Sequence, residues 1–224
     1  MDNIKLIEVK EDILADNNQL AAGVRDRLKR KKTLLLNLMS SPGSGKTSLI
    51  LRTVEGLKDT LRLGVIEADI DSTVDAEKVS AQGIPAIQLR TGGFCHLDAT
   101  MVSQGLAALE NEALDLIIIE NVGNLVCPAE FDTGAHKNVM ILSIPEGDDK
   151  PLKYPLMFSI CDVLLVNKMD YLPLSDFDRE ALQRRVLSLN PRIRIMEVSC
   201  KTKEGMGKWI DWLKAEWAAF RGPG

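Results

Sequence analysis

The stretch SSPGSGKTS, residues 40 to 48, directly follows the apolar run TLLLNLM at residues 33 to 39. The next segment, SLILRTVEGLKD at residues 48 to 59, has apolar residues at helical spacing. A glycine-rich turn between a strand and a helix is where a phosphate-binding loop of the Walker A type belongs. Consecutive backbone N–H groups in such a turn, together with the helix N-terminus, cradle phosphate oxygens. We therefore expect this loop to bind the phosphates of a nucleotide.

The residue types in the loop suit this chemistry. The expected phosphate-binding residues are Gly43, Ser44, Gly45, Lys46, Thr47 and Ser48. Lys46 should reach the β- and γ-phosphates, and the Thr47 hydroxyl should ligate Mg²⁺. The first glycine of the pattern G-x-x-x-x-G-K-[ST] is replaced by Ser40. That departure removes no phosphate-contacting group, so the prediction stands.

Apolar runs recur along the rest of the chain and alternate with helix-like stretches. The runs are TLLLNLM (33–39), LRLGVIEAD (61–69), DLIIIEN (115–121), VMILSIPE (139–146), DVLLVNKMD (162–170) and RIRIMEVS (192–199). Several are apolar on consecutive residues, which is typical of strands buried on both faces. Strands that alternate with helices predict an α/β fold, a three-layer P-loop NTPase with a mostly parallel central sheet flanked by helices. The stretch EGDDKPLKYP, residues 146 to 155, is expected to be an internal loop.

The motif NKMD, residues 167 to 170, ends one of the buried runs, at the sheet edge where ligands of open α/β sheets bind. A carboxylate there accepts hydrogen bonds from guanine N1–H and N2–H₂, a donor pair that adenine lacks. Asp170 is therefore expected to read the base, with Asn167 beside it and Lys168 over the ring, so that GTP is preferred to ATP. The stretch SCKTKEG that follows the last run resembles the guanine loop of GTPases. It adds Ser199, Cys200 and Lys201 to the expected nucleotide-binding residues.

Residues 1 to 32 differ from the rest of the chain. Apolar residues at helical spacing precede a basic run from Arg25 to Lys32. We predict an N-terminal helical extension over residues 1–32 and a GTPase domain over residues 33–224. The basic run is interpreted as the solvated end of a helix, where cations suit the helix dipole; a contact with phosphate or an acidic partner is the alternative.

The magnesium side of the site is less regular. GTPases carry D-x-x-G after the third strand, and here Glu120 to Gly123 supplies a glutamate instead. The expected magnesium ligands are Thr47, Asp69, Asp75 and Glu120, and the expected catalytic residues are Lys46, Asp69 and Glu120. Asp69 and Glu120 are favoured because both end buried runs, whereas Asp71 and Asp75 are equally well explained as a capped helix start. No activating glutamine or arginine is identifiable, so slow intrinsic turnover is expected. Lys153 is a candidate for a charge supplied by a second subunit, although a solvated loop lysine is the simpler interpretation.

Cysteine and histidine are scarce, with four and two residues, yet three of these six share a chemistry. Cys95 and His96 are adjacent after a glycine pair, and Cys127 follows Glu120 by seven residues. Thiolate and imidazole suit Zn²⁺ or Ni²⁺ much better than Mg²⁺. Three ligands leave an open position, as a site that releases its metal requires. From the residues alone, the alternative is a Cys-His pair and an unrelated cysteine without a metal. Cys161 is expected in the core, and Cys200 to act through its backbone.

Composition restricts the class of protein. The 224 residues are 45% hydrophobic and 27% charged, with a formal net charge of −4, which disfavours binding of nucleic acid through bulk charge. No apolar run reaches the ~20 residues that span a bilayer, and the first residues lack the pattern of a secretory signal. We expect a cytoplasmic protein that binds neither membrane nor nucleic acid.

Taken together, the motifs in residues 33 to 205 resemble those of the HypB family, the nickel-incorporation GTPases of [NiFe]-hydrogenase maturation. The segments that carry the resemblance are SSPGSGKTS, EADIDSTVDAEKV, TGGFCHLDA, IIIENVGNLVCP, EGDDKPLKYP and NKMD. The resemblance implies a GTPase of the signal-recognition-particle and MinD class that dimerises with nucleotide. It also implies that Cys95, His96 and Cys127 ligate nickel or zinc at the subunit interface.

The resemblance also implies partners: a second copy in a homodimer, a HypA-type nickel accessory protein and the hydrogenase large subunit precursor. Residues 1 to 32 contain neither Cys nor His, so the nickel-storage segments of some family members are not expected. One alternative is the related GTPase of urease maturation, which carries Cys-Pro-His where this chain has Phe94 to His96 and lacks the later cysteine. The other is a GTP-gated interaction module whose cysteines have no metal role.

Overall fold

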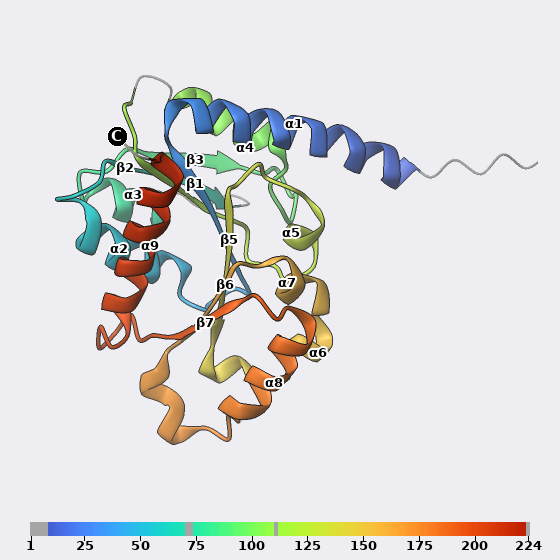
Figure 1. The fold of residues 1–224 in the computed structure, drawn as a ribbon, viewed down its shortest axis with the longest axis vertical. Helices are drawn as coiled ribbons and strands as arrows, with labels where there is room; N and C mark the ends of the chain where they lie inside the picture. Colours follow the sequence, from blue (N-terminus) through green and yellow to red (C-terminus); the bar gives the residue numbers. More distant parts are fainter. Residues whose placement is uncertain (1–8, 70–73, 110–111, 223–224) are drawn as a thin grey trace, which may run out of the picture.

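A sheet of seven parallel strands forms the middle of the molecule (Figure 1). The structure, a computed structural model, describes residues 9–69, 74–109 and 112–222, with side chains of residues 9–13 and 74–75 excepted. The strands are β1 (Leu34–Ser40), β2 (Leu63–Asp69), β3 (Ala86–Arg90), β4 (Leu116–Glu120), β5 (Lys137–Ser143), β6 (Val163–Asn167) and β7 (Arg194–Glu197). Their order across the sheet is β3-β2-β4-β1-β5-β6-β7, and every ladder between them is parallel. The carboxyl ends of all seven strands therefore meet at one edge, with β1 and its phosphate loop in the centre.

Helices connect the strands and cover both faces of the sheet. They are α1 (Val9–Lys31), α2 (Lys46–Leu57), α3 (Val74–Ser80), α4 (Ala99–Ala108), α5 (Cys127–Glu130), α6 (Lys150–Lys153), α7 (Pro155–Ile160), α8 (Arg179–Leu189) and α9 (Met206–Arg221), with 3-10 turns η1 (Ile144–Glu146) and η2 (Met169–Leu174). Helices α2, α3 and α9 pack on one face, and α1, α4, α7 and α8 pack on the other. The predicted three-layer α/β fold is confirmed.

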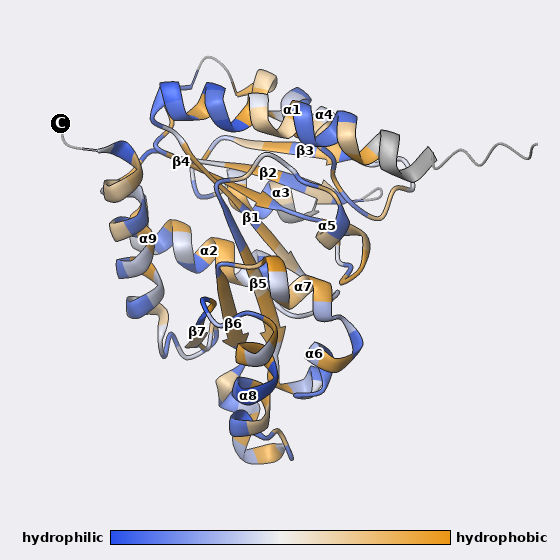
Figure 2. Cartoon of the chain, turned by 45° about the vertical axis from the view of Figure 1, so that its right-hand side comes forward, coloured by the Kyte–Doolittle hydropathy of each residue, from blue (hydrophilic) through white to orange (hydrophobic). Residues whose placement is uncertain are grey.

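Strand β1 shows how the sequence builds the layers. Leu34, Leu36 and Leu38 pack into the core under α2 and α9, whereas Leu35 and Met39 face the opposite layer. Because side chains alternate along a strand, a strand that is covered on both faces must be apolar at nearly every position. Figure 2 shows the same property in the other central strands, which are hydrophobic along their length. Burial of the apolar strands in the middle layer holds their ends in place, and the polar residues of the site begin at these ends.

Two local expectations from the sequence differ from the structure. Strand β3 was not among the predicted runs, because AIQLR interrupts its apolar residues with polar ones and lies half-buried at the sheet edge. The expectation that residues 146–155 form a loop was wrong: η1 ends at Glu146, and α6 and α7 follow in quick succession. Pro151 and Pro155 lie in the first turns of these short helices, where a missing N–H costs nothing and the fixed φ favours the helix.

Helix α1 is the predicted N-terminal helix, and it lies along α4 (Figure 1). Val24 and Leu28 are buried with Leu35 and Leu106 in the same apolar cluster. Three basic residues form its last turn, as the interpretation of the basic run requires. The division of the chain at residue 32 stays a prediction.

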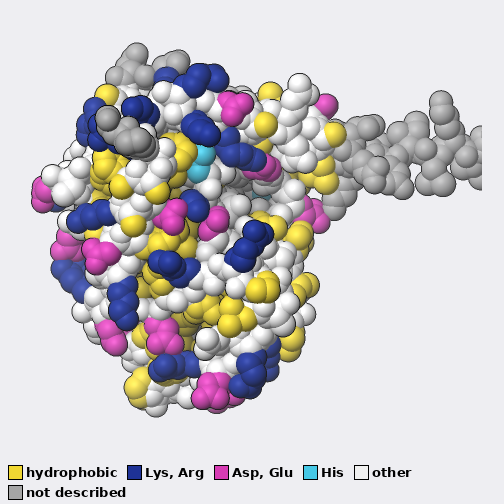
Figure 3. Space-filling model, viewed as in Figure 1, with side chains coloured by type: hydrophobic (Ala, Val, Ile, Leu, Met, Phe, Trp, Pro, Cys, Tyr) yellow, Lys and Arg dark blue, Asp and Glu magenta, His cyan; other side chains and the backbone are white. Residues whose placement is uncertain are grey.

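Two surface properties bear on the expected partners. No helix in the described part of the chain has the length and apolar character needed to cross a membrane. On the face that Figure 3 shows, basic and acidic side chains are interspersed over the surface.

Candidate nucleotide and metal sites

The phosphate loop joins the end of β1 to the start of α2. Gly45 caps α2 in a left-handed conformation, with φ of 103°. A Cβ at this position would lie 2.6 Å from Asn167 Nδ2, so both the backbone angle and the close approach of the guanine motif require glycine. The side chain of Asn167 donates to the Ser44 carbonyl at 2.9 Å and accepts from the Cys200 backbone N–H at 3.2 Å. Asn167 thus fastens the phosphate loop to the guanine loop.

Lys46 and Thr47 lie where α2 begins, at the open side of the loop. Lys46 Nζ donates to Ser40 Oγ at 3.1 Å. Ser40 is wholly buried, so the residue that replaces the usual first glycine serves as a support for the lysine. Thr47 Oγ1 donates to Glu120 Oε1 at 3.0 Å, which brings the hydroxyl and the carboxylate predicted for magnesium into direct contact.

A cleft of about 500 Å³ opens in front of this loop. Its lining includes Lys46, Thr47, Glu67, Asp69, Glu120 and Gly123. The structure therefore places Asp69 and Glu120 together, as expected from their positions at strand ends. Asp71 lies outside the described residues, and so does the side chain of Asp75, whose backbone is in α3.

Glu67 is a carboxylate in this cleft that the sequence prediction missed. It is 3% exposed and pairs in register with Glu120 of the neighbouring strand. The sequence did carry a signal for Glu67: it lies two residues before Asp69, and this spacing places both side chains on the same side of β2. A charged residue inside a buried apolar run also calls for an explanation by itself.

A second cleft, of about 770 Å³, adjoins the first and shares Gly45 and Ser48 with it. The predicted base-binding residues that line it are Asn167, Lys168, Asp170, Cys200 and Lys201. Lys168 Nζ donates to the Gly43 carbonyl at 2.8 Å, which lays its stem along the cleft. The two clefts form one continuous surface with a phosphate half and a base half.

Asp170 is held in place by its neighbours in the guanine loop. Ser199 Oγ donates to Asp170 Oδ1 at 2.7 Å, and Lys201 Nζ lies 3.8 Å from Oδ2. Arg52 of α2 was not predicted, yet it lines this cleft and donates from Nε to the Cys200 carbonyl at 2.9 Å. The Cys200 backbone thus bonds to both Arg52 and Asn167, and burial raises the pKa of its thiol to about 11.

Glu146 is a further residue that sequence reasoning missed. Its carboxylate accepts from the hydroxyls of Ser41, Ser44 and Ser143, with 2.8 Å from Ser44 Oγ and 2.7 Å from Ser143 Oγ. Ser143 and Glu146 form a capping box, so the S-x-x-E spacing was a readable signal. Two of the three hydroxyls belong to the phosphate loop, so Glu146 in η1 connects that loop to Ser143 at the end of β5.

The predicted metal ligands come together between β3, α4 and α5. One donor atom each from Cys95, His96 and Cys127 lies within 4.8 Å of the others. The two Sγ atoms are 2.8 Å apart, and both thiols are free. The hydrogen bond with Cys95 raises the pKa of the Cys127 thiol, and burial raises it further. Metal binding requires both thiols to lose their protons, a loss that the positive charge of the ion favours.

His96 is fixed by aromatic contacts. Its ring stacks on Phe131 with centroids 3.9 Å apart, and Phe94 meets it edge-on at 6.2 Å. Burial lowers the pKa of His96, which favours the neutral imidazole that metals bind. Cys161, by contrast, is in the core as expected; it lies just before β6, and burial raises the pKa of its thiol.

Known proteins resemble this chain over most of its length. A family model described as the CobW/HypB/UreG nucleotide-binding domain matches residues 34–197. A hydrogenase maturation factor HypB of Azotobacter vinelandii is 48% identical over 212 residues, which cover 95% of this chain and 70% of that protein.

Two solved structures have the same fold. The crystal structure of HypB from Helicobacter pylori in complex with nickel has a TM-score of 0.86 at 36% identity and covers 90% of this chain and 95% of its own. HypB from Archaeoglobus fulgidus has a TM-score of 0.85 at 38% identity and covers 92% of this chain and 100% of its own.

The family model groups HypB with UreG, so by itself it does not separate hydrogenase from urease maturation. The curated relative and both structures are named HypB, and their likeness extends well beyond the matched domain. The resemblance that the motifs predicted is confirmed: this chain belongs to the CobW/HypB/UreG family, within it to the HypB hydrogenase maturation factors.

Proposed function

We propose that this protein hydrolyses GTP to GDP and phosphate, and that it uses this cycle to deliver nickel to the precursor of a [NiFe]-hydrogenase large subunit. One observation carries the proposal. The segment from Glu120 to Cys127 starts at the phosphate cleft, where Glu120 accepts from Thr47, and ends at the Cys/His cluster. Nucleotide chemistry and metal binding thus share eight consecutive residues.

The base half of the cleft supports GTP as the substrate. Asp170 offers acceptor oxygens, and Asn167 and Lys168 fix the loops that face it. In the phosphate half, Lys46 stabilises charge that develops on the γ-phosphate as its bond to the β-phosphate breaks and water attacks. The sequence motifs identify no activating glutamine or arginine finger, so we expect intrinsic turnover to be slow.

A magnesium ion fits the phosphate half by its donor set. The Thr47 hydroxyl and the buried Glu120 carboxylate are in contact, and Asp69 lines the same cleft, so hard oxygen ligands converge there. When bound, the ion neutralises charge on the β- and γ-phosphates. Thr47, Asp69 and Glu120 would hold it; Asp75 remains a candidate.

The Cys/His cluster supports a transferable cargo of nickel or zinc. Three ligands leave at least one coordination position for an incoming ligand from a partner. A HypA-type accessory protein and the hydrogenase large subunit precursor are the partners proposed on either side of this transfer, in the cytoplasm.

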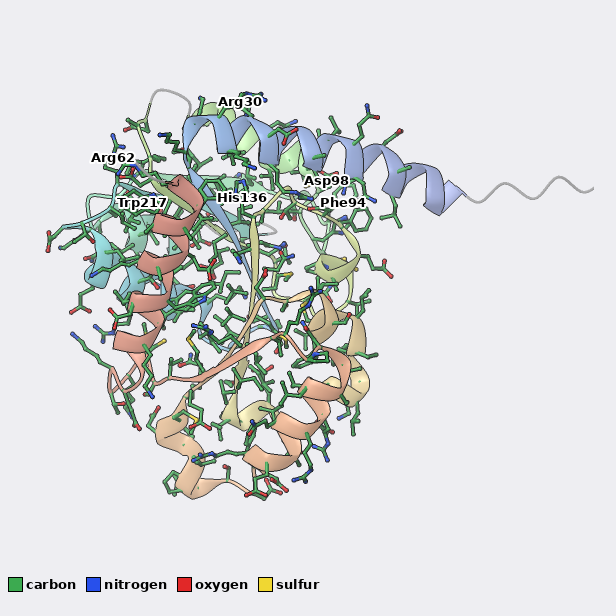
Figure 4. All side chains as sticks on the ribbon, in the orientation of Figure 1. Arg30, Arg62, Phe94, Asp98, His136 and Trp217 are labelled. Atoms are coloured by element: carbon green, nitrogen blue, oxygen red, sulfur yellow. The ribbon has the colours of Figure 1, made fainter. Side chains whose placement is uncertain are left out.

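The surroundings of the cluster support a homodimer. Phe94 and Val126 each precede a metal ligand directly, and they are 57% and 50% exposed. Figure 4 shows Phe94 at the surface below α1. Large exposed apolar residues around a functional site are typical of a surface that another protein covers. A second copy would bury them and enclose the metal.

The experiment tests whether the bound nucleotide changes the affinity of the Cys/His cluster for metal. Nickel and zinc dissociation constants are measured by chelator competition with GDP and with a non-hydrolysable GTP analogue, each with Mg²⁺. We expect the affinity to differ between the two states, and Cys95→Ala to abolish tight binding in both. Cys161→Ala is the matched control, because Cys161 lies in the core and outside the cluster; this variant should retain tight metal binding. Equal affinities of the wild type in both states contradict the proposed function.

A further inference from the structure

Asn121 occupies a special position between the two sites. It follows Glu120 at the end of β4 and is wholly buried. Its Oδ1 accepts from the backbone N–H of Val122 at 2.9 Å and of Leu97 at 3.3 Å. Leu97 directly follows the metal ligand His96. One amide oxygen therefore joins the residue after the phosphate-cleft carboxylate to the residue after a metal ligand.

The segment around Asn121 also touches the phosphate loop. A Cβ on Gly123 would lie 3.0 to 3.2 Å from three atoms of Pro42, so the two backbones are packed without space between them. At the start of the same segment, the Glu120 carboxylate accepts a hydrogen bond from the Thr47 hydroxyl. A nucleotide that moves the phosphate loop or the Thr47 hydroxyl must displace Glu120 to Gly123 as well.

Asn124 makes a different link three residues later. Its Nδ2 donates to the Cys95 carbonyl at 3.3 Å, and its Oδ1 accepts from the Val126 N–H at 2.9 Å. Asn124 thus connects the two ligand segments to each other. Both of these hydrogen bonds of Asn124 lie on the metal side, whereas those of Asn121 connect the metal side to the sheet.

We propose that Asn121 is a positioning residue that transmits the nucleotide state to Cys95 and His96, an inference that rests on the proposed function and deepens it. The buried N–H of Leu97 has its acceptor in Asn121, and leaving such a donor unpaired costs free energy. When Glu120 to Gly123 move, the Leu97 N–H follows Asn121 Oδ1, and the ligand loop moves with it. Cys127 is carried by the same segment along the chain, so all three ligands shift together.

A purely structural role for Asn121 makes a different prediction. Its Nδ2 donates to Asn37 Oδ1 at 3.1 Å, and Asn37 Nδ2 donates to Asn138 Oδ1 at 3.1 Å. This ladder of three asparagines crosses from β4 through β1 to β5 and satisfies buried polar groups. If the ladder were all that mattered, Asn138→Ala and Asn121→Ala would change the metal site alike.

The test compares three variants of the full chain by their nickel and zinc dissociation constants with GDP and with the GTP analogue. We expect the metal dissociation constants of the wild type to differ about tenfold between the two nucleotide states, which is within the usual range of coupled sites. The two constants of Asn121→Ala should differ by no more than about twofold. Asn124→Ala should weaken binding by the same factor in both states and keep the ratio. Asn138→Ala should change neither the metal affinity nor its ratio between the two nucleotide states. The thiolate-to-nickel absorption band should shift between nucleotide states in wild type but not in Asn121→Ala.

A measurement without substitutions covers the case in which Asn121→Ala does not fold. Amide hydrogen exchange of the wild type should show the peptide containing Leu97 changing its protection together with the peptide of residues 120–124 when GTP analogue replaces GDP. A wild-type ratio that persists in Asn121→Ala, or Leu97 protection that is unchanged between states, overturns this inference alone. Equal metal affinities of the wild type in both states overturn the proposed function, and the inference with it.

Discussion

Asp170 is kept as an acceptor by its surroundings. Ser199 Oγ and Lys201 Nζ both present hydrogens to the carboxylate, and the side chain is 15% exposed. A site whose buried polar groups match the substrate's donors discriminates strongly, because a wrong partner leaves them unpaired. We therefore predict that the base preference depends on one carboxylate and its two neighbours.

Asp170→Asn should weaken GTP binding about tenfold to a hundredfold, because the amide replaces one of two acceptors with a donor that faces guanine N–H. Xanthosine triphosphate carries a carbonyl where guanine has its exocyclic amine, so it should bind the variant better than GTP does. Fluorescent nucleotide titration measures both affinities. Asp176→Asn, in the loop after η2, is the control; unchanged GTP affinity in Asp170→Asn contradicts the predicted role.

His136 links α1, β1 and α9. Its Nδ1 accepts from the Leu35 N–H at 3.0 Å, and Nε2 lies 3.3 Å from the Arg25 carbonyl, while Phe220 packs on the ring at 4.4 Å between centroids. Figure 4 shows the ring below α1. An acceptor at Nδ1 fixes the neutral tautomer with its hydrogen on Nε2.

Burial lowers the pKa of His136; the hydrogen bond with the Arg25 carbonyl opposes this shift, and the charges of Arg25 and Lys29 add to it. The unfolded chain, with a histidine pKa near 6.5, then binds more protons than the folded chain. Folding stability should be complete above this pH and decrease as the pH falls below it, by less than about 1 kcal/mol for a half-buried ring. Urea unfolding from about pH 8 to about pH 5 should show a smaller loss in His136→Asn, whose oxygen still accepts from Leu35. Equal losses in both chains contradict this assignment.

At the residue scale, the sequence predicted those site residues that lie in contiguous motifs. The loop from Gly43 to Ser48 and the NKMD motif were readable because their chemistry is local. Glu146 was missed because two of its hydroxyl partners lie more than 100 positions away in the chain. The contact of Asn121 with Leu97 was likewise unreadable, because it depends on how β4 lies beside the loop after β3.

At the scale of elements, β3 and the segment after β5 show where periodicity stops being informative. Central strands buried on both faces produce apolar runs, but the edge strand β3 is only half-covered and mixes polar with apolar residues. The segment after β5 was expected to be a loop, whereas its prolines lie in the first turns of α6 and α7. The central strands, where burial is complete, were all predicted; of the two edge strands, β7 lies within a predicted run, whereas β3 was missed.

The segment from Glu120 to Gly123 begins at the end of β4 and packs directly against the phosphate loop. Gly123→Ala places a Cβ against the Pro42 backbone and should push this segment away from the loop. We expect a stability loss of about 1 kcal/mol from overpacking, and about tenfold slower GTP hydrolysis with GDP affinity retained. Phosphate release and thermal unfolding measure both.

Gly207→Ala is the matched control, because a Cβ there meets no atom within 4 Å. It lies in α9, where alanine should leave stability unchanged or raise it by about 0.5 kcal/mol. If Gly123→Ala hydrolysed GTP at the wild-type rate, the close packing on Pro42 would have no bearing on catalysis.

At the scale of the whole molecule, the parallel sheet brings both sites to related positions. The phosphate and base clefts occupy the edge where the strands end, and the Cys/His cluster lies beside them, beyond β3 and β4. The three predicted metal ligands are only partly buried in a single chain, and the exposed residues Phe94 and Val126 lie next to them. A nucleotide-driven association of two chains would change the surroundings of the metal without any ligand being replaced.

Phe94 and Val126 should therefore determine the association of two chains. Each is about half exposed and adjoins a metal ligand, so a second copy that encloses the cluster must bury them. The double variant Phe94→Ser, Val126→Ser removes apolar area from that contact and should weaken dimerisation with the GTP analogue by about tenfold or more. Sedimentation equilibrium with GDP and with the analogue measures it. Leu174→Ser is the control, because Leu174 is 84% exposed but lies after β6, remote in the fold from the Cys/His cluster. If the double variant dimerised as wild type does, the chains would associate through another face, and the metal would be open to solvent in both nucleotide states.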